Sequence, residues 1–197
     1  MTPPLHNFMN HQLSPQEKET LLHIARESLE LGLRGEKLPQ LEAKTPLLEA
    51  DGATFVTLTI DGQLRGCIGA LEPYRPLIED VREHALAAAQ KDYRFNPVRP
   101  EELDSIEIEI SRLTQPIPLE YDDALDLLQK LRPGVDGVVL KDGQRRATFL
   151  PQVWEQLPDP KIFLSELCAK MGIPSNAWQR KKLDVLIYQV EEFREKK

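Results

Sequence analysis

The sequence predicts an α+β fold with a mainly antiparallel sheet, and three observations support this class. Two Asp-Gly pairs, at 61–62 and 142–143, each stand between short runs of strand-forming residues, which is the pattern of a β-hairpin. Apolar and polar side chains alternate along 105–111, as they do in a half-buried strand. The runs with helical spacing are set apart from these hairpins, so we expect antiparallel strands with helices beside them.

The first expected helix follows Ser14. The stretch Ser14-Pro15-Gln16-Glu17 has the form of a capping box, with proline at the first helical position. Apolar residues then recur every three or four positions from Leu21 to Leu29, and Gly32 is expected to end the helix. Residues 1–13 contain two prolines and no periodicity, so we interpret them as a flexible tail that precedes the folded part, 14–197.

The first Asp-Gly pair predicts a hairpin whose register can be argued from its side chains. A three-residue loop ending at Gln63 would set Leu58 opposite Gly66 and keep one face apolar. A two-residue loop would set Leu58 opposite Arg65 and mix the faces, which a half-buried hairpin avoids. We therefore predict the three-residue loop, which places Arg65 and Cys67 together on the face turned away from the core.

The remaining elements follow from the same two periodicities and from the positions of proline and glycine. The expected helices are 75–90, 122–131, 151–156, 162–171 and 175–180, and the expected strands are 54–60, 105–113, 137–141, 146–150 and 183–193. The segments 61–65 and 142–146 share the string Asp-Gly-Gln-x-Arg, 81 positions apart. This echo is consistent with internal duplication of a strand-rich unit, although turn chemistry alone also recreates Asp-Gly pairs.

Composition excludes several classes of protein. The chain has 197 residues, with 25 Lys and Arg against 32 Asp and Glu, so its net charge is −7. Nucleic-acid binding is disfavoured because it needs clustered basic residues, and the only candidates are 145–146 and 180–182. No apolar run is long enough to span a membrane, and the first residues lack the pattern of a secretory signal. We therefore expect a cytoplasmic protein.

The most unusual local sequence surrounds Cys67. Glycines at 66 and 69 weaken a strand, so they indicate a bulge or the close approach of another backbone or a ligand. Arg65, on the same predicted face, would favour the thiolate of Cys67 and support a reactive thiol. The alternative is that this cysteine is a small buried hydrophobe, which is the interpretation we give to Cys168 on an apolar helix face.

Two further segments supply candidate site residues. Asp92 and Arg94 lie at a helix end and could orient a substrate, although such residues often pair at a surface. Glu109 shares a strand face with Glu107, and acidic pairs serve in acid–base chemistry when burial separates their pKa values, although a solvated strand face is the commoner explanation of such a pair. The two cysteines form no disulfide framework, and no local metal or nucleotide motif is present, so we expect neither a metal nor a cofactor.

The string LRGCIG, Leu64 to Gly69, resembles the signature of the AMMECR domain family, and the resemblance extends from about Gln16 to Phe193. It implies an α+β fold with a larger and a smaller lobe, and it implies that LRGCIG lies near their junction. It also implies association with a Memo-like protein and a radical S-adenosylmethionine protein in a modification pathway, while the family has no settled activity. The other matching segments are 92–95, 101–103, 108–111, 134–137, 147–153 and 167–172.

Two functional hypotheses follow. In the first, the chain is an enzyme or enzyme component with a Cys67 thiolate, Arg65 as electrostatic support, and Asp92, Arg94 and Glu109 positioning substrate or handling protons. In the second, it is a non-catalytic binding or adaptor module, in which the exposed backbone around LRGCIG forms a recognition surface. The sequence does not decide between them.

Overall fold

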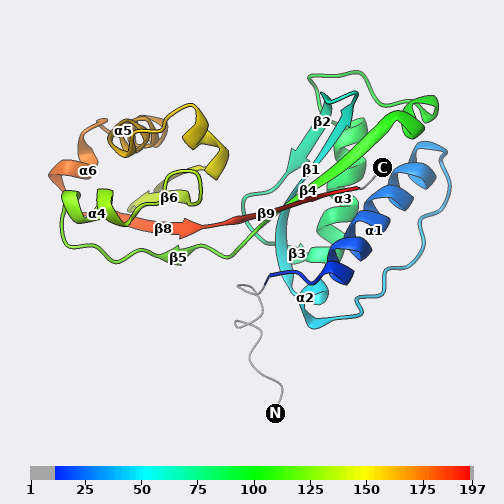
Figure 1. The fold of residues 1–197 in the computed structure, drawn as a ribbon, viewed down its shortest axis with the longest axis horizontal. Coiled ribbons are helices and arrows are strands. Elements are labelled where there is room, and N and C mark those ends of the chain that lie inside the picture. The colour runs from blue at the N-terminus through cyan, green and yellow to red at the C-terminus, as the bar shows by residue number, and fades with distance from the viewer. Residues whose placement is uncertain (1–11, 196–197) are drawn as a thin grey trace, which may run out of the picture. The chain divides into compact units, whose positions relative to one another are not determined.

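The computed structural model describes residues 12–195 and divides them into two compact units (Figure 1). The first unit runs to Thr114 and resumes at Glu191, and the second comprises Gln115–Val190. Both units combine helices with antiparallel strands, which confirms the predicted α+β class. No helix among the described residues is long and apolar enough to cross a membrane.

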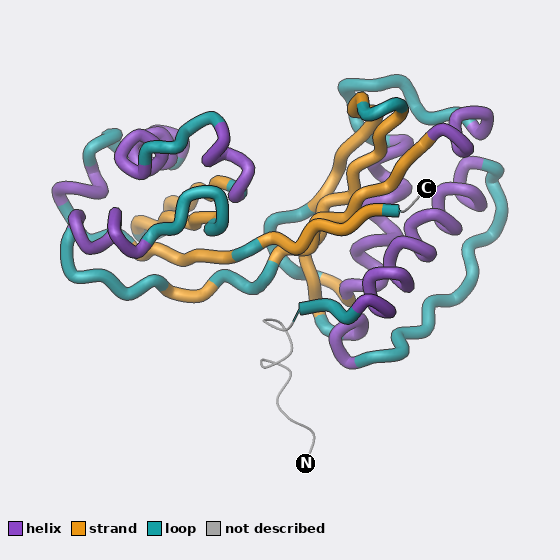
Figure 2. The backbone as a smooth tube through the Cα atoms, in the orientation of Figure 1, coloured by secondary structure: helices purple, strands orange, loops and turns teal. Residues whose placement is uncertain are grey.

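The first unit is a sheet with helices on one face. Its strands lie in the order β2-β1-β4-β9, and β3 pairs with the start of β1. Helices α1 and α3 pack together beside β1 and β4 (Figures 1 and 2). The elements are α1 (Pro15–Leu33), α2 (Pro46–Glu49), β1 (Asp51–Ile60), β2 (Gln63–Gly69), β3 (Arg75–Pro76), α3 (Leu77–Gln90), a 3₁₀ helix (Pro100–Ser105), β4 (Ile106–Leu113) and β9 (Val190–Arg194).

Helix α1 begins as predicted but ends later. The capping box is present, because Ser14 accepts the Glu17 amide and the Glu17 carboxylate accepts the Ser14 amide. The predicted apolar stripe from Leu21 to Leu29 is buried. Gly32 does not end the helix, because the left-handed residue that follows the last turn is Gly35, at φ +70°.

The first hairpin corrects the predicted loop and keeps the predicted pairing from Leu58 and Gly66 onward, whereas Leu64 lies opposite Thr59 and not opposite Ile60, and is 42% exposed. Asp61 and Gly62 form a two-residue turn at φ 51° and 74°, so that Ile60 pairs with Gln63. A bulge at Arg65 then absorbs one residue and sets Leu58 opposite Gly66. From Gly66 onward the apolar face is thus preserved by a bulge and not by a longer loop.

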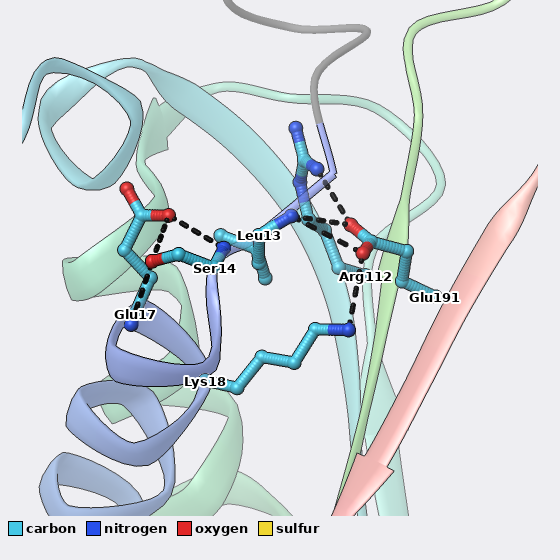
Figure 3. Close-up of polar contacts among 6 residues, drawn as sticks. All are labelled: Leu13, Ser14, Glu17, Lys18, Arg112 and Glu191. Carbon is cyan, nitrogen blue, oxygen red and sulfur yellow. Dashed lines mark hydrogen bonds and ion pairs between the residues drawn. The ribbon is translucent and has the colours of Figure 1, made fainter.

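The last strand of this unit is anchored by a buried ion pair (Figure 3). Arg112 on β4 donates to the Glu191 carboxylate at 2.8 Å, and Lys18 of α1 lies 3.3 Å from the same group. The amide of Leu13 also donates to Glu191, and the Leu13 side chain is buried in the core. Leu13, predicted to belong to the flexible tail, is therefore part of the folded unit, while residues 1–11 of that tail lie outside the described part.

The second unit is a sheet in the order β5-β8-β6-β7 with its own apolar core. The expected final strand is two strands: β8 belongs to this sheet and β9 to the first. The short strand β5, at a Pro-x-Pro sequence, was not expected. The elements are β5 (Ile117–Pro118), α4 (Ala124–Lys130), β6 (Gly137–Asp142), β7 (Arg145–Phe149), a 3₁₀ helix (Pro151–Glu155), α5 (Pro160–Lys170), α6 (Ala177–Arg180) and β8 (Asp184–Tyr188).

The two units share one order of elements. Each has a helix, a hairpin, a further helical segment and a strand that returns antiparallel to the first hairpin strand: β4 beside β1, and β8 beside β6. Each returning strand also pairs with one further strand at the edge of its sheet. Strand β4 pairs with β9, which follows β8 in the sequence, and β8 pairs with β5, which follows β4. This common order supports the duplication that the Asp-Gly-Gln-x-Arg echo indicates.

Candidate functional site

Cys67 lies in a row of side chains on the sheet face opposite the helices. Cys67 on β2 lies directly opposite Thr57 on β1, and Thr57 lies directly opposite Glu109 on β4. Residues directly opposite each other share a face of a sheet, and the neighbouring Val56 and Leu58 point into the core. The thiol therefore belongs to the polar face, as the predicted register required.

The sulfur has a specific partner. The Thr57 hydroxyl donates to Cys67 Sγ at 3.3 Å, and the cysteine is half-buried. A hydroxyl donor at this distance stabilises negative charge on sulfur. Thr57 was not named as a candidate, although the predicted register already placed it on this face.

The main chain of Cys67 is held from outside the sheet. Because β2 is an edge strand, backbone groups on its outer side have no neighbouring strand to pair with. The Cys67 amide instead donates to Asp92 Oδ2 at 2.9 Å, and its carbonyl accepts from Arg94 Nη2 at 3.3 Å. The turn after α3 thus takes the place of a further strand at this point.

Asp92 and Arg94 form a bidentate ion pair. Arg94 Nε donates to Oδ1 at 2.9 Å and Nη2 to Oδ2 at 2.7 Å, while the Asp92 residue is only 5% exposed. The hydrogen bonds from Arg94 hold the pKa of Asp92 far below its usual range, against the effect of burial and with help from the Cys67 amide. A carboxylate with so low a pKa is a weak base, so these contacts favour an anchoring role for Asp92 over proton transfer.

Arg65 has other partners. Its Nε donates to Glu102 Oε1 at 2.8 Å, and its Nη1 donates to the Asn96 carbonyl at 3.0 Å. The hydrogen bond from Arg65 also lowers the pKa of Glu102, against the effect of burial. The guanidinium expected to support the thiolate is therefore neutralised by a carboxylate that the sequence analysis did not single out, 37 positions away.

Glu109 lies in the same row but belongs to a different pair. Its carboxylate is 3.1 Å from Arg194 on β9. Of the five predicted site residues, the structure joins Cys67, Asp92 and Arg94 directly, places Glu109 beyond Thr57, and binds Arg65 to Glu102. Cys168 is fully buried and burial raises the pKa of its thiol, in agreement with a packing role.

Gly66 allows the helix to approach the strand closely. A Cβ atom on this residue would lie 2.2 Å from the carbonyl oxygen of Ala88 in α3. Gly69 is confined similarly, since its Cβ would lie 2.4 Å from the Phe55 ring. The expected close approach is confirmed, and at Gly66 the approaching group is a backbone.

Among residues 12–195 no group of three or more His, Cys, Asp or Glu side chains could hold a metal ion.

Comparison with known proteins gives consistent matches over most of the chain. A sequence model of the family described as AMMECR1 matches residues 22–193. A protein of Methanothermobacter thermautotrophicus is 42% identical over 185 residues, covering 93% of this chain and 96% of the relative. Protein MK0488 of Methanopyrus kandleri is 35% identical over 195 residues, covering 95% and 92%. The crystal structure of uncharacterized protein PH0010 from Pyrococcus horikoshii matches with a TM-score of 0.75 and 32% identity, covering 93% of this chain and 94% of that one.

Proposed function

Because the chain belongs to the AMMECR1 family, we propose that it acts through the Cys67 thiol as a component of a modification pathway with a Memo-like protein and a radical S-adenosylmethionine protein. The observation that carries the chemical part is the Thr57 hydroxyl on Cys67 Sγ. The pathway part rests on the resemblance of LRGCIG and its companion segments to the family.

The proposed chemistry is nucleophilic substitution, in which the thiolate bonds to an electrophilic carbon while the leaving group on that carbon departs with the bonding electrons. Asp92 and Arg94 fix the backbone of Cys67 on its outer side, and Thr57 fixes the direction of the sulfur. A nucleophile held in this way loses little freedom on reaching the transition state. The half-buried thiol loses its proton to water, while Glu109, beyond Thr57 in the row and paired with Arg194, is left to position the substrate.

The test is alkylation of the native protein by iodoacetamide, followed residue by residue by mass spectrometry. The Cys67 sulfur forms a bond to carbon and iodide leaves, while buried Cys168 serves as the internal control. We expect Cys67 to react without denaturant and Thr57→Val to slow it several-fold, whereas Thr57→Ser keeps the rate. Reaction of Cys67 only in denaturant, or an unchanged rate in Thr57→Val, would contradict the reactive-thiol proposal.

The pathway part is tested by reconstitution with the Memo-like and radical S-adenosylmethionine proteins. Cys67→Ser is expected to abolish the activity of the mixture while leaving the fold intact. Full activity of Cys67→Ser would rule out catalysis by the thiol.

A binding or adaptor role is the second candidate, and the exposure of Tyr93 favours it. This aromatic side chain is 95% exposed although it directly follows Asp92, and exposed tyrosines are common anchors in protein interfaces. If Tyr93→Ala loses binding to both partner proteins while Cys67→Ser retains binding and activity, the adaptor role replaces the catalytic one.

A further inference from the structure

A second hydrogen-bonded group of titratable side chains lies in the first unit, around helix α3. Asp80 and His84 stand one turn apart on this helix, and His84 Nδ1 is 3.1 Å from Asp80 Oδ2. Both residues are buried, Asp80 completely. None of the Cys67 contacts described above involves either residue.

The surroundings of Asp80 determine how the imidazole is oriented. Oδ2 also accepts the Thr54 amide at 2.9 Å and the Thr54 hydroxyl at 2.7 Å, so all its described donors converge on one oxygen. The other oxygen, Oδ1, is buried without a hydrogen-bond partner among the described residues. A carboxylate bound to Nδ1 retains the proton on that nitrogen, which leaves Nε2 of His84 as an acceptor.

The acceptor nitrogen faces a partly exposed tyrosine. His84 Nε2 lies 3.5 Å from the Tyr74 hydroxyl, and Tyr74 is 53% exposed. Arg75 Nη2 donates to the same hydroxyl at 3.0 Å, and its guanidinium lies 4.4 Å from the ring centroid. The Tyr74 oxygen is thus placed between a proton acceptor and a cation.

We propose that Tyr74 is a second reactive residue of this chain, a nucleophile toward an activated acyl group, with His84 as its base and Asp80 as a positioning residue. The order carboxylate, imidazole and hydroxyl is that of an activated nucleophile. The phenolic proton passes to His84 Nε2, the phenolic oxygen bonds to the acyl carbon, and the leaving group departs with the bonding electrons and takes the proton from His84. Arg75 stabilises the negative charge that develops beside it.

The test uses N-acetylimidazole on the intact protein, with acetylation of each tyrosine followed by mass spectrometry. The acetyl carbon bonds to the phenolic oxygen and imidazole leaves. Tyr93 is the internal control because it is 95% exposed, against 53% for Tyr74, and none of its described contacts involves a histidine. We expect Tyr74 to react at least about ten times faster than Tyr93, although exposure alone predicts the reverse order.

Variants separate this reactivity from folding. His84→Gln is expected to bring the Tyr74 rate down to or below that of Tyr93, with the Tyr93 rate unchanged. Arg75→Gln changes a partly exposed side chain and is expected to slow Tyr74 several-fold without affecting the fold. In wild-type protein the ¹⁵N NMR signals of His84 should show the proton on Nδ1, and Asp80→Asn should shift it. Faster acetylation of Tyr93 than of Tyr74 in the wild-type protein, or an unchanged Tyr74 rate in a folded His84→Gln, would overturn the proposal.

Discussion

At the scale of single residues, Asp92 shows how one carboxylate can hold the main chain beside a thiol. Its carboxylate accepts the Cys67 amide and the Arg94 guanidinium and is shielded from water. Replacing it leaves the Cys67 amide and the Arg94 guanidinium without this acceptor. A buried donor that has lost its acceptor costs the protein the free energy of its desolvation. Loss of function on changing Asp92 is therefore no evidence for proton transfer by this residue.

The depressed pKa of Asp92 makes a prediction about stability and pH. A carboxylate whose pKa is lower in the folded state adds stability at neutral pH, and that stability is lost as the pH falls below about 4 toward the folded value. We expect Asp92→Asn to lower the free energy of unfolding at pH 7 by about 1–3 kcal/mol and to differ less from wild type at pH 3. Urea denaturation at both values measures this.

The control for this prediction is Glu36→Gln, which changes an exposed loop carboxylate and should leave the free energy of unfolding unaltered. If Asp92→Asn and the wild-type protein differ by the same amount at pH 7 and pH 3, the ion pair contributes no pH-dependent stability.

The sequence could indicate which residues of the candidate site are unusual, but not which partners they have. Cys67, with its flanking glycines, was recognisable from local composition, as were Asp92 and Arg94. That Asp92, 25 positions after Cys67, binds the Cys67 amide depends on where α3 ends. The pairing of Arg65 with Glu102 likewise depends on the bulge and on the 3₁₀ helix before β4, neither of which has a strong local signal.

At the scale of elements, the contact between β2 and α3 is set by the absence of a side chain at Gly66. We expect Gly66→Ala to destabilise the protein by about 2 kcal/mol or more, because the new Cβ meets the Ala88 carbonyl oxygen, a backbone atom of a packed helix. Thermal unfolding followed by circular dichroism measures the effect.

Gly32→Ala is the matched control for Gly66→Ala. The Cβ added there meets the end of the flexible Leu86 side chain, at 2.4 Å, and alanine is the better helix former. A melting temperature of Gly66→Ala equal to that of the wild-type protein would show that α3 can move away from β2 without loss of stability.

The elements themselves were predictable to the extent that their signals are local. The start of α1 followed from its capping box, and the face of β4 followed from its alternation. The loop of the first hairpin was wrong because a bulge restores the alternation that the two-residue turn disturbs. The last strand was predicted as one because nothing in its β-branched sequence shows that its two halves pair in different sheets.

At the scale of the whole molecule, the chain passes from the first sheet to the second after β4 and returns to the first after β8. Strand β5 follows β4 directly but pairs in the second sheet, and β9 follows β8 but pairs in the first. The second unit is continuous in sequence, whereas the first includes β9, which follows the second unit along the chain. The two units should therefore respond differently to being separated.

We predict that residues 115–190 fold when expressed alone, because they contain all four strands of their sheet and their own core. Residues 12–114 alone should not fold stably, since β4 lacks β9 and Arg112 loses its ion pair with Glu191, which is a severe loss for a buried charge. Thermal unfolding and the dispersion of amide NMR signals distinguish the two outcomes.

Joining Thr114 to Glu191 by a short glycine–serine linker is expected to restore the first unit, because Arg112 and Glu191 already lie in contact across adjacent strands. A stable fold of residues 12–114 without β9 would show that this strand is dispensable.

The position of β9 after the second unit in sequence also bears on how the protein is made. During synthesis the helices, the hairpin and β4 of the first unit leave the ribosome long before Glu191 does. Until then β4 has an unpaired edge, and the buried site of Arg112 has no carboxylate from β9. An open strand edge of this kind is a template for association with other chains. The nascent first unit is thus exposed to aggregation for as long as the second is being translated, because its sheet is completed only after residues 115–190 have been made.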